Sequence, residues 1–207
     1  MLANTLIILD FETTGLSPNM GDRAIEIGAV RLRDGKLVDS FQELMNPGFY
    51  IDTFIENYTG ITNDMLTDAR PCGSVMKDFC DYIGDDNLVA HNASFDQRFL
   101  DAEFEEISHQ YSGKFVCSML LARRLYQESP NHQLGTLIQY KNIPAKGDFH
   151  RALFDAEMTG KLWLQMLTDL EDTHQLFEPT FAQVKKLSKT PKNKINSVIE
   201  KWNQKTT

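Results

Sequence analysis

Two carboxylates close the apolar run Thr5-Leu6-Ile7-Ile8-Leu9-Asp10-Phe11-Glu12-Thr13-Thr14-Gly15, which decides the fold because it predicts a buried strand. Side chains alternate along a strand, so Asp10 and Glu12 project from the same face. Two like charges on a buried strand repel each other and lose hydration, which is costly without a partner. Carboxylate oxygens are the ligands that magnesium and manganese prefer. The run therefore indicates a site for a hard divalent cation.

A third carboxylate, Asp96, follows the short apolar stretch Asn87-Leu88-Val89-Ala90, which predicts another strand. Ser94 and Gln97 have the spacing of a capping box, which predicts a helix that begins at Ser94 with Asp96 in its first turn. Two roles for Asp96 stay open at this point. It either complements the helix dipole or joins the carboxylates of the first strand.

A histidine and a fourth carboxylate occur in His150-Arg151-Ala152-Leu153-Phe154-Asp155-Ala156, at the start of a long predicted helix. Asp155 lies on or beside the apolar stripe of that helix, and a carboxylate that faces a core needs a partner. His150 is placed to reach the rim of a cleft. A surface or capping histidine has the same sequence context, however, and Asp148 is an equally good N-cap.

Together the three motifs resemble the DnaQ-like 3′→5′ exonucleases of the DEDDh type, in the order and with about the spacing of that superfamily. The resemblance extends from Thr5 to Leu170, and within the superfamily the chain is most similar to the proofreading (epsilon) subunits of bacterial replicative DNA polymerases. Shorter matches are Ala24-Ile25-Glu26-Ile27-Gly28-Ala29, Thr59-Gly60-Ile61-Thr62 and Leu121-Ala122-Arg123. One departure is visible, because the chain has Cys117-Ser118-Met119-Leu120 where many relatives have Asp-Thr before Leu-Ala-Arg.

The resemblance implies a role for each matching position. Two divalent metal ions, Mg²⁺ or Mn²⁺, are expected on four acids, namely Asp10, Glu12, Asp96 and Asp155. His150 is expected to be the general base that takes a proton from the attacking water. Contacts with the terminal nucleotide are expected at Thr13, Thr14, Leu16 and Asn92. The implied reaction is hydrolysis at the 3′ end of a single strand, with DNA favoured over RNA and release of nucleoside 5′-monophosphates.

Two other functions are compatible with these residues. The first is an exoribonuclease, since relatives with the same set of acids trim RNA ends. The spacing of the carboxylates does not distinguish a DNA substrate from an RNA substrate. A nucleic-acid-binding or polymerase-associated module without activity is the second alternative. The complete set of four acids and one histidine argues against it, since unused buried acids only cost stability. A metal-dependent assay on labelled DNA and RNA oligomers separates the three functions.

The pattern of elements predicts an α/β fold, a mixed five-stranded sheet flanked by helices, which is the ribonuclease-H-like architecture that the resemblance also implies. Strands are expected at 5–11, 24–33, 36–45, 87–90 and 114–117, with a tight turn at Asp34-Gly35. Helices are expected at 52–58, 62–68, 74–83, 94–107, 119–127, 133–140, 151–170 and 194–202. Ligands gather at the strand ends of such sheets, where Asp10 and Glu12 should lie.

Charge is distributed unevenly over the 207 residues, of which 42% are apolar. The net charge is −8, but residues 181–207 hold seven lysines and one glutamate, hence +6, which leaves −14 for the rest. We expect an exonuclease domain over residues 1–178 and a basic tail over 179–207. The lysines of the tail either contact phosphates or keep a frayed end soluble. Its apolar stripe packs on the domain or on a partner and consists of Ile195, Val198, Ile199 and Trp202.

The sequence also gives expectations about the location, the cysteines and the partners of the protein. No signal peptide is visible at the N-terminus, and the apolar runs are too short to span a bilayer, so we expect a cytoplasmic protein with no membrane partner. Cys72, Cys80 and Cys117 have no metal-type spacing and are expected to be reduced thiols. Nucleic acid 3′ ends are the expected partner, and the resemblance adds a DNA polymerase.

Overall fold

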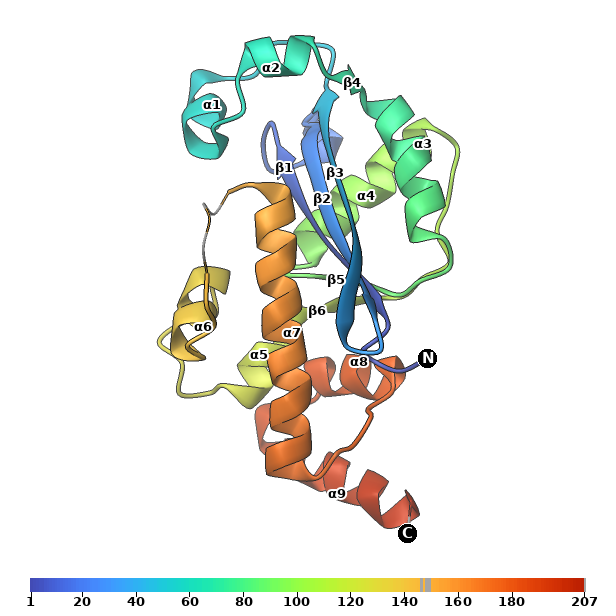
Figure 1. Cartoon of the computed structure of the whole chain (residues 1–207), viewed down its shortest axis with the longest axis vertical. Coiled ribbons are helices and arrows are strands. Elements are labelled where there is room, and N and C mark those ends of the chain that lie inside the picture. The colour runs from blue at the N-terminus through green and yellow to red at the C-terminus, as the bar shows by residue number, and fades with distance from the viewer. Residues whose placement is uncertain (146, 148–149, 207) are drawn as a thin grey trace.

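A twisted sheet with helices on both faces forms the centre of the molecule (Figure 1). The computed structural model describes residues 1–145, 147 and 150–206. The strands lie in the order β4-β3-β2-β1-β5-β6, with β2 antiparallel to both β1 and β3 and the other pairs parallel. Their bounds are β1 (Leu6–Thr13), β2 (Ala24–Arg33), β3 (Lys36–Asn46), β4 (Arg70–Pro71), β5 (Leu88–Ala90) and β6 (Phe115–Cys117).

The predicted mixed sheet is therefore confirmed, but its predicted strand count of five was wrong. The sixth strand, β4, has only two residues, which pair with Met45 and Asn46 of β3. Two residues carry no alternation of apolar and polar side chains, so sequence alone gives no signal for such a strand. The turn at Asp34-Gly35 is confirmed, because both residues have positive φ angles, as a two-residue hairpin of the favoured type requires.

The expected helices are present within a few residues of their predicted ends, and one further helix, α8, was not expected. The bounds are α1 (Thr53–Thr59), α2 (Asn63–Thr67), α3 (Cys72–Ile83), α4 (Ser94–Glu106), α5 (Ser118–Leu125), α6 (Leu134–Tyr140), α7 (Ala152–His174), α8 (Phe181–Lys189) and α9 (Ile195–Thr206). Thr180 and Gln183 form a capping box at the start of α8, which explains why the helix begins there.

The central strand β1 is buried on both faces, which explains its nearly continuous apolar sequence. Leu6 and Ile8 pack into the cluster that contains Trp163 of α7. Ile7 and Leu9 face the opposite layer, formed by α3 and α4. Because side chains alternate, the positions after Ile8 on the α7 side are those of Asp10 and Glu12.

The segment after Glu178 packs on the rest of the fold. Phe181 and Leu187 of α8 and Ile195 and Ile199 of α9 are buried in the same cluster as α7, with Val198 and Trp202 packed against it. The frayed-end alternative was therefore wrong, and docking of the apolar stripe on the domain itself is confirmed. The division of the chain at Glu178 stays a prediction.

The segment that leads into α8 also pairs with the N-terminal segment. Leu2 and Thr180 form an antiparallel bridge, and two main-chain hydrogen bonds join this region, from the N–H of Ala3 to the oxygen of Pro179 at 2.8 Å and from the N–H of Phe181 to the oxygen of Met1 at 3.1 Å. The three cysteines are free. In the part of the chain that the structure describes, we find no helix with the length and apolar character needed to cross a membrane.

Candidate active site

The carboxyl end of β1 carries the first two acids. Glu12 is only 8% exposed and Asp10 is half-buried, and both lie on the face that α7 covers. Ligand atoms of Glu12, His150 and Asp155 all lie within 4.8 Å of one another. The end of β1 and the start of α7 therefore form one cluster of polar side chains, although they are some 140 positions apart in sequence.

The start of α7 is held against β2 by a buried carboxylate, Glu26. Its oxygens accept hydrogen bonds from the backbone N–H of Ala152 at 3.0 Å and from the guanidinium of Arg151 at 2.8 and 3.2 Å. Arg151 occupies the N-cap position without a capping side chain, so Glu26 supplies the acceptor that an N-cap residue normally provides. Asp148, the predicted alternative N-cap, lies outside the described residues.

Gly28 allows α7 to approach the sheet closely. A Cβ at this position would overlap the backbone nitrogen of Leu153, so no other residue fits without movement of the helix. Gly28 is also the partner of Asp10 across the β1–β2 pair. The close approach therefore places the first turn of α7, with Asp155, beside Asp10.

Asp155 is fixed through one of its two carboxylate oxygens. The backbone N–H of His150 donates to Oδ2 at 2.9 Å, while Oδ1 is buried and has no hydrogen-bond partner among the described residues. His150 has a φ of 70°, a left-handed conformation that is uncommon for residues other than glycine. Its exposed ring contacts the ring of Tyr58 from α1, with centroids 4.3 Å apart.

Asp96 joins the cluster from the opposite layer. It is buried in the first turn of α4, as predicted, and its Oδ1 accepts a hydrogen bond of 3.2 Å from the backbone N–H of Phe11, between Asp10 and Glu12. The predicted capping box was wrong, because Ala93 is the N-cap and Ser94 is already the first helical residue. The chain reaches the helix directly from the loop after β5, which leaves Ser94 inside the first turn.

The four acids destabilise one another as charged groups. Burial, followed by the charges of Asp96, Glu12 and Asp155, raises the pKa of Asp10 well above its usual range. Burial, followed by the charge of Asp155, raises the pKa of Glu12 to about 8, and burial raises the pKa of Asp96 to about 7. Burial also raises the pKa of Asp155. A divalent cation removes this repulsion, and the unpartnered Oδ1 of Asp155 is a ready ligand, so the donor set fits such an ion.

A cavity of about 860 Å³ opens over this cluster, and we call it the acid cavity. Asp10, His150 and Asp155 line one part of it, and the exposed Arg123 of α5 lines another. None of the ion pairs among the described residues includes Arg123. The cavity therefore combines a cluster of acids with a single unpaired guanidinium.

The four positions predicted to touch a nucleotide differ in their surroundings. Asn92 lines the acid cavity and has a φ of 67°. The hydroxyl of Thr13 donates to the oxygen of Gly15 at 2.6 Å, and that of Thr14 accepts from the N–H of Arg23 at 3.0 Å, so both shape the loop after β1. Leu16 is 76% exposed on that loop. Nucleotide contact at these positions stays a prediction.

Sequence reasoning assigned no role to several residues of the acid cavity, among them Tyr58, His91 and Arg123. The ring nitrogens of His91 bond to Oγ of Ser118 and to the oxygen of His132, both at 2.9 Å, and burial lowers the pKa of His91 to about 4. It is thus a neutral link between the loop after β5 and α5. Arg123 belongs to one of the shorter matches, Tyr58 directly precedes another, and His91 directly follows the predicted strand that ends at Ala90, which was the available signal.

The sheet, the acids at the end of its central strand and the cavity above them define a nuclease of the ribonuclease-H-like class. A model of the exonuclease family RNase_T matches residues 7–163, and the chain belongs to this family. Its predicted membership of the DnaQ-like 3′→5′ exonucleases is thereby confirmed, as is the enzyme class. Members of this family generally use divalent metal ions.

Known relatives are similar over most of the chain. The PolC-type DNA polymerase III of Listeria innocua is 39% identical over 173 residues, and that of Bacillus subtilis is 41% identical over 167 residues. These alignments cover 83% and 80% of this chain but only 12% of each polymerase, so the chain spans about an eighth of the length of these relatives.

Solved structures show the same fold. Exonuclease X in complex with 5′ overhanging duplex DNA is 27% identical, with a TM-score of 0.67 over 88% of this chain and 99% of that one. The nuclease domain of 3′hExo, a DEDDh family member bound to rAMP, has a TM-score of 0.70 at 21% identity over 80% of this chain and 92% of that one. The predicted ribonuclease-H-like fold class is confirmed.

Proposed function

We propose that this chain removes nucleotides from the 3′ end of single-stranded DNA and releases nucleoside 5′-monophosphates. The observation that carries the proposal is the convergence of buried carboxylates from β1, α4 and α7, one of whose oxygens, Oδ1 of Asp155, has no hydrogen-bond partner among the described residues. Two Mg²⁺ or Mn²⁺ ions would be held by Asp10, Glu12, Asp96 and Asp155. When bound, they supply Lewis acidity and charge neutralisation for phosphodiester hydrolysis.

His150 is the general base in this proposal. Its ring lies at the exposed rim of the cluster, with a ring nitrogen within 4.8 Å of carboxylate oxygens of Glu12 and Asp155. There the ring takes the proton of the attacking water, a contribution of roughly 10²–10⁴ in rate. The hydrogen bond from its main chain to Asp155 and the ring of Tyr58 limit the movement of the imidazole.

The acid cavity holds the terminal nucleotide. Its volume of about 860 Å³ is in the usual range for small-molecule sites. We assign the unpaired Arg123 to a phosphate oxygen and Asn92 to the terminal nucleotide. Leu16, with its exposed side chain, contacts the terminal base.

DNA is the favoured substrate because the relatives at about 40% identity are DNA polymerases and Exonuclease X was solved with DNA. We infer that the chain acts beside a DNA polymerase in the cytoplasm. An RNA substrate is the alternative, and the activity test described next distinguishes DNA from RNA as the substrate.

The activity test uses 5′-labelled DNA and RNA strands of equal sequence, with Mg²⁺, with Mn²⁺ or with chelator. We expect stepwise shortening from the 3′ end of DNA that stops with chelator. His150→Gln should lower turnover by about 10²-fold or more while metal affinity, measured by calorimetry, stays near that of the wild type. Cleavage that persists in chelator contradicts the metal assignment, and faster cleavage of RNA contradicts the DNA assignment.

A second test follows the metal without measuring activity. An ion that binds only the folded state stabilises it by mass action, so Mg²⁺ or Mn²⁺ should raise the midpoint of thermal unfolding. A variant with alanine at all four acids should lack the shift. An equal shift in that variant would place the ions elsewhere on the acidic surface.

A further inference from the structure

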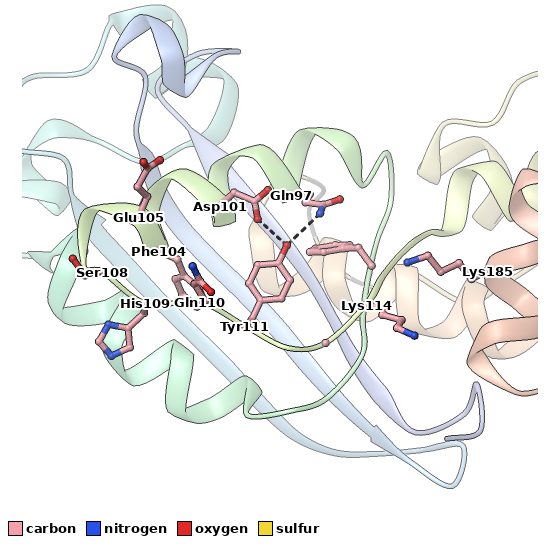
Figure 2. A pocket seen from close by; sticks show the side chains of 12 residues that line it. Gln97, Asp101, Phe104, Glu105, Ser108, His109, Gln110, Tyr111, Lys114 and Lys185 are labelled. Atoms are coloured by element: carbon pink, nitrogen blue, oxygen red, sulfur yellow. Dashed lines mark hydrogen bonds between the residues drawn. The ribbon is translucent and has the colours of Figure 1, made fainter.

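A second cavity of about 860 Å³ lies beside α4 and the edge strand β6, apart from the acid cavity. Figure 2 shows Lys185 of α8 and Lys114 at one end of it, and Glu105 and His109 toward the other. A smaller cavity of about 380 Å³ adjoins the lysine end, because Gln97, Phe115 and Lys185 line both. Lys189 lines the smaller cavity. We call this end, with Lys114, Lys185 and Lys189, the lysine groove.

The three ammonium groups of the lysine groove lie close enough to repel one another. Burial, followed by the charges of Lys189 and Lys114, lowers the pKa of Lys185. None of the ion pairs found within the described ranges includes these lysines. The neighbouring Lys186 differs, since its ammonium lies over the ring of Trp202, 5.7 Å from the centroid.

Such a cluster costs stability, and a bound anion offsets that cost. Lys185 and Lys189 are four residues apart on one helix, a spacing at which like charges destabilise the helix. The remainder of the protein has a charge of −14 before residue 181, so most of its surface repels a polyanion. The lysine groove is thus a local exception on an acidic molecule.

The lysine groove adjoins the acid cavity along the chain at two places. Asn92 lines the acid cavity, and the next residues, Ala93 and Ser94, line the smaller cavity of the groove. In the same way, Met119 lines the acid cavity and Leu120 lines the smaller cavity. A strand that leaves the acid cavity over the starts of α4 and α5 therefore arrives at the lysines.

We propose that the lysine groove binds the phosphate backbone of the substrate strand, on the 5′ side of the nucleotides held in the acid cavity. The inference rests on the proposed function, because it takes the acid cavity as the site of the 3′ end. Lysine ammonium groups contact phosphates as point charges and read no base, so DNA and RNA strands should be held alike. The occupant is a strand that continues beyond the acid cavity.

The test compares the wild type with the triple variant Lys114→Gln, Lys185→Gln, Lys189→Gln. Affinity for a single strand of about 12 nucleotides is measured in chelator over a series of salt concentrations. Each phosphate contact on a single strand contributes about 0.7 to the slope of log affinity against log salt, so three lost contacts should flatten the slope by about 2. Affinity at low salt should fall about tenfold or more. The triple Lys→Arg variant keeps the three charges, so its affinity at low salt and its salt slope should stay near those of the wild type.

The matched control is Lys192→Gln, Lys194→Gln, Lys201→Gln, which removes the same charge from exposed positions of the C-terminal segment. It should flatten the slope by less than one unit. The proposal is overturned if the slope of log affinity against log salt is the same for the wild type and the groove variant. It is also overturned if the control variant flattens this slope as much as the groove variant does. In either case an acidic protein surface is the next occupant to test. Strand cleavage by the wild type is scored separately, so loss of the groove and loss of the exonuclease function remain distinguishable.

Discussion

The backbone N–H of His150 donates a hydrogen bond of 2.9 Å to Oδ2 of Asp155, so the positions of the proposed base and of one proposed metal ligand depend on each other. Oδ1 of the same carboxylate stays free of hydrogen bonds within the described residues. One oxygen thus sets the geometry of the main chain, and the other is available to an ion.

Asp155→Asn separates these two functions of the carboxylate. The amide oxygen still accepts the hydrogen bond from His150, whereas the negative charge is lost. We expect most exonuclease activity to disappear, with an unfolding midpoint in chelator equal to or above that of the wild type, because burial opposes the charged form. Turnover and thermal unfolding in chelator check this. Wild-type turnover in Asp155→Asn would remove Asp155 from the site.

Tyr58 is expected to position the ring of His150. It is 53% exposed, stacks on Phe54 with centroids 6.0 Å apart and contacts His150 at 4.3 Å. Tyr58→Ala should lower kcat about tenfold or more, since small displacements of a reacting group are costly, while Tyr58→Phe keeps the ring and most of the rate. Single-turnover rates over a range of pH provide the measurement. Equal losses in both variants would instead assign the effect to the hydroxyl.

Gly28→Ala should destabilise the fold and lower activity together. The new Cβ would overlap the backbone of Leu153 and push the start of α7 away from β2, a strain of about 1–3 kcal/mol or more. Gly160→Ala is the matched control inside α7, because its Cβ would meet side-chain methyl groups and no backbone, with Cδ1 of Ile8 at 3.3 Å and Cγ2 of Val30 at 3.6 Å as the nearest atoms. The measurement is the free energy of unfolding in urea and the turnover of both variants, and both quantities should be lower for Gly28→Ala than for Gly160→Ala. Similar stability in the two variants would mean that α7 adjusts without cost.

His91 should make the protein less stable as the pH falls below neutrality. Its pKa is lowered to about 4 by burial, against an ordinary value of 6.5. Between these values the unfolded chain takes up a proton on this residue that the folded protein does not, so His91 contributes a decrease in the free energy of unfolding as the pH drops from about 6.5 to about 4. The raised pKa values of Glu12 and Asp96 contribute an increase over the same range, so the effect of His91 is read as a difference between two proteins. In urea unfolding, the free energy of unfolding of His91→Gln should fall less, or rise more, than that of the wild type as the pH drops through this range. The same pH dependence in both proteins would mean that His91 does not contribute to the acid sensitivity.

Elements whose signals are local could be predicted from the sequence. The β2–β3 hairpin follows from Asp34-Gly35 between alternating strands, and α7 follows from an apolar stripe of helical period. The alternation along β1 also places Asp10 and Glu12 on one face. The structure brings both acids together with Asp96, His150 and Asp155, although their roles stay predictions.

Features that depend on contacts between distant segments could not be predicted in this way. The capping of α7 by Glu26 joins positions 126 residues apart, and nothing at Glu26 itself indicates a helix terminus. The lysine groove arises only because α8 packs beside β6 and α5, which no local pattern of lysines shows. Likewise, Tyr58 becomes a partner of His150 only when α1 and the start of α7 meet.

The bridge between Leu2 and Thr180 ties the segment that precedes β1 to the residues that lead into α8. The chain then continues into α8 and α9, whose apolar side chains are buried in the same cluster as α7. Removal of the residues from Thr180 onward would therefore take away a main-chain partner of the segment before β1 and part of the apolar cover of α7. Two of the elements that supply the clustered acids, β1 and α7, thus depend on the last two helices.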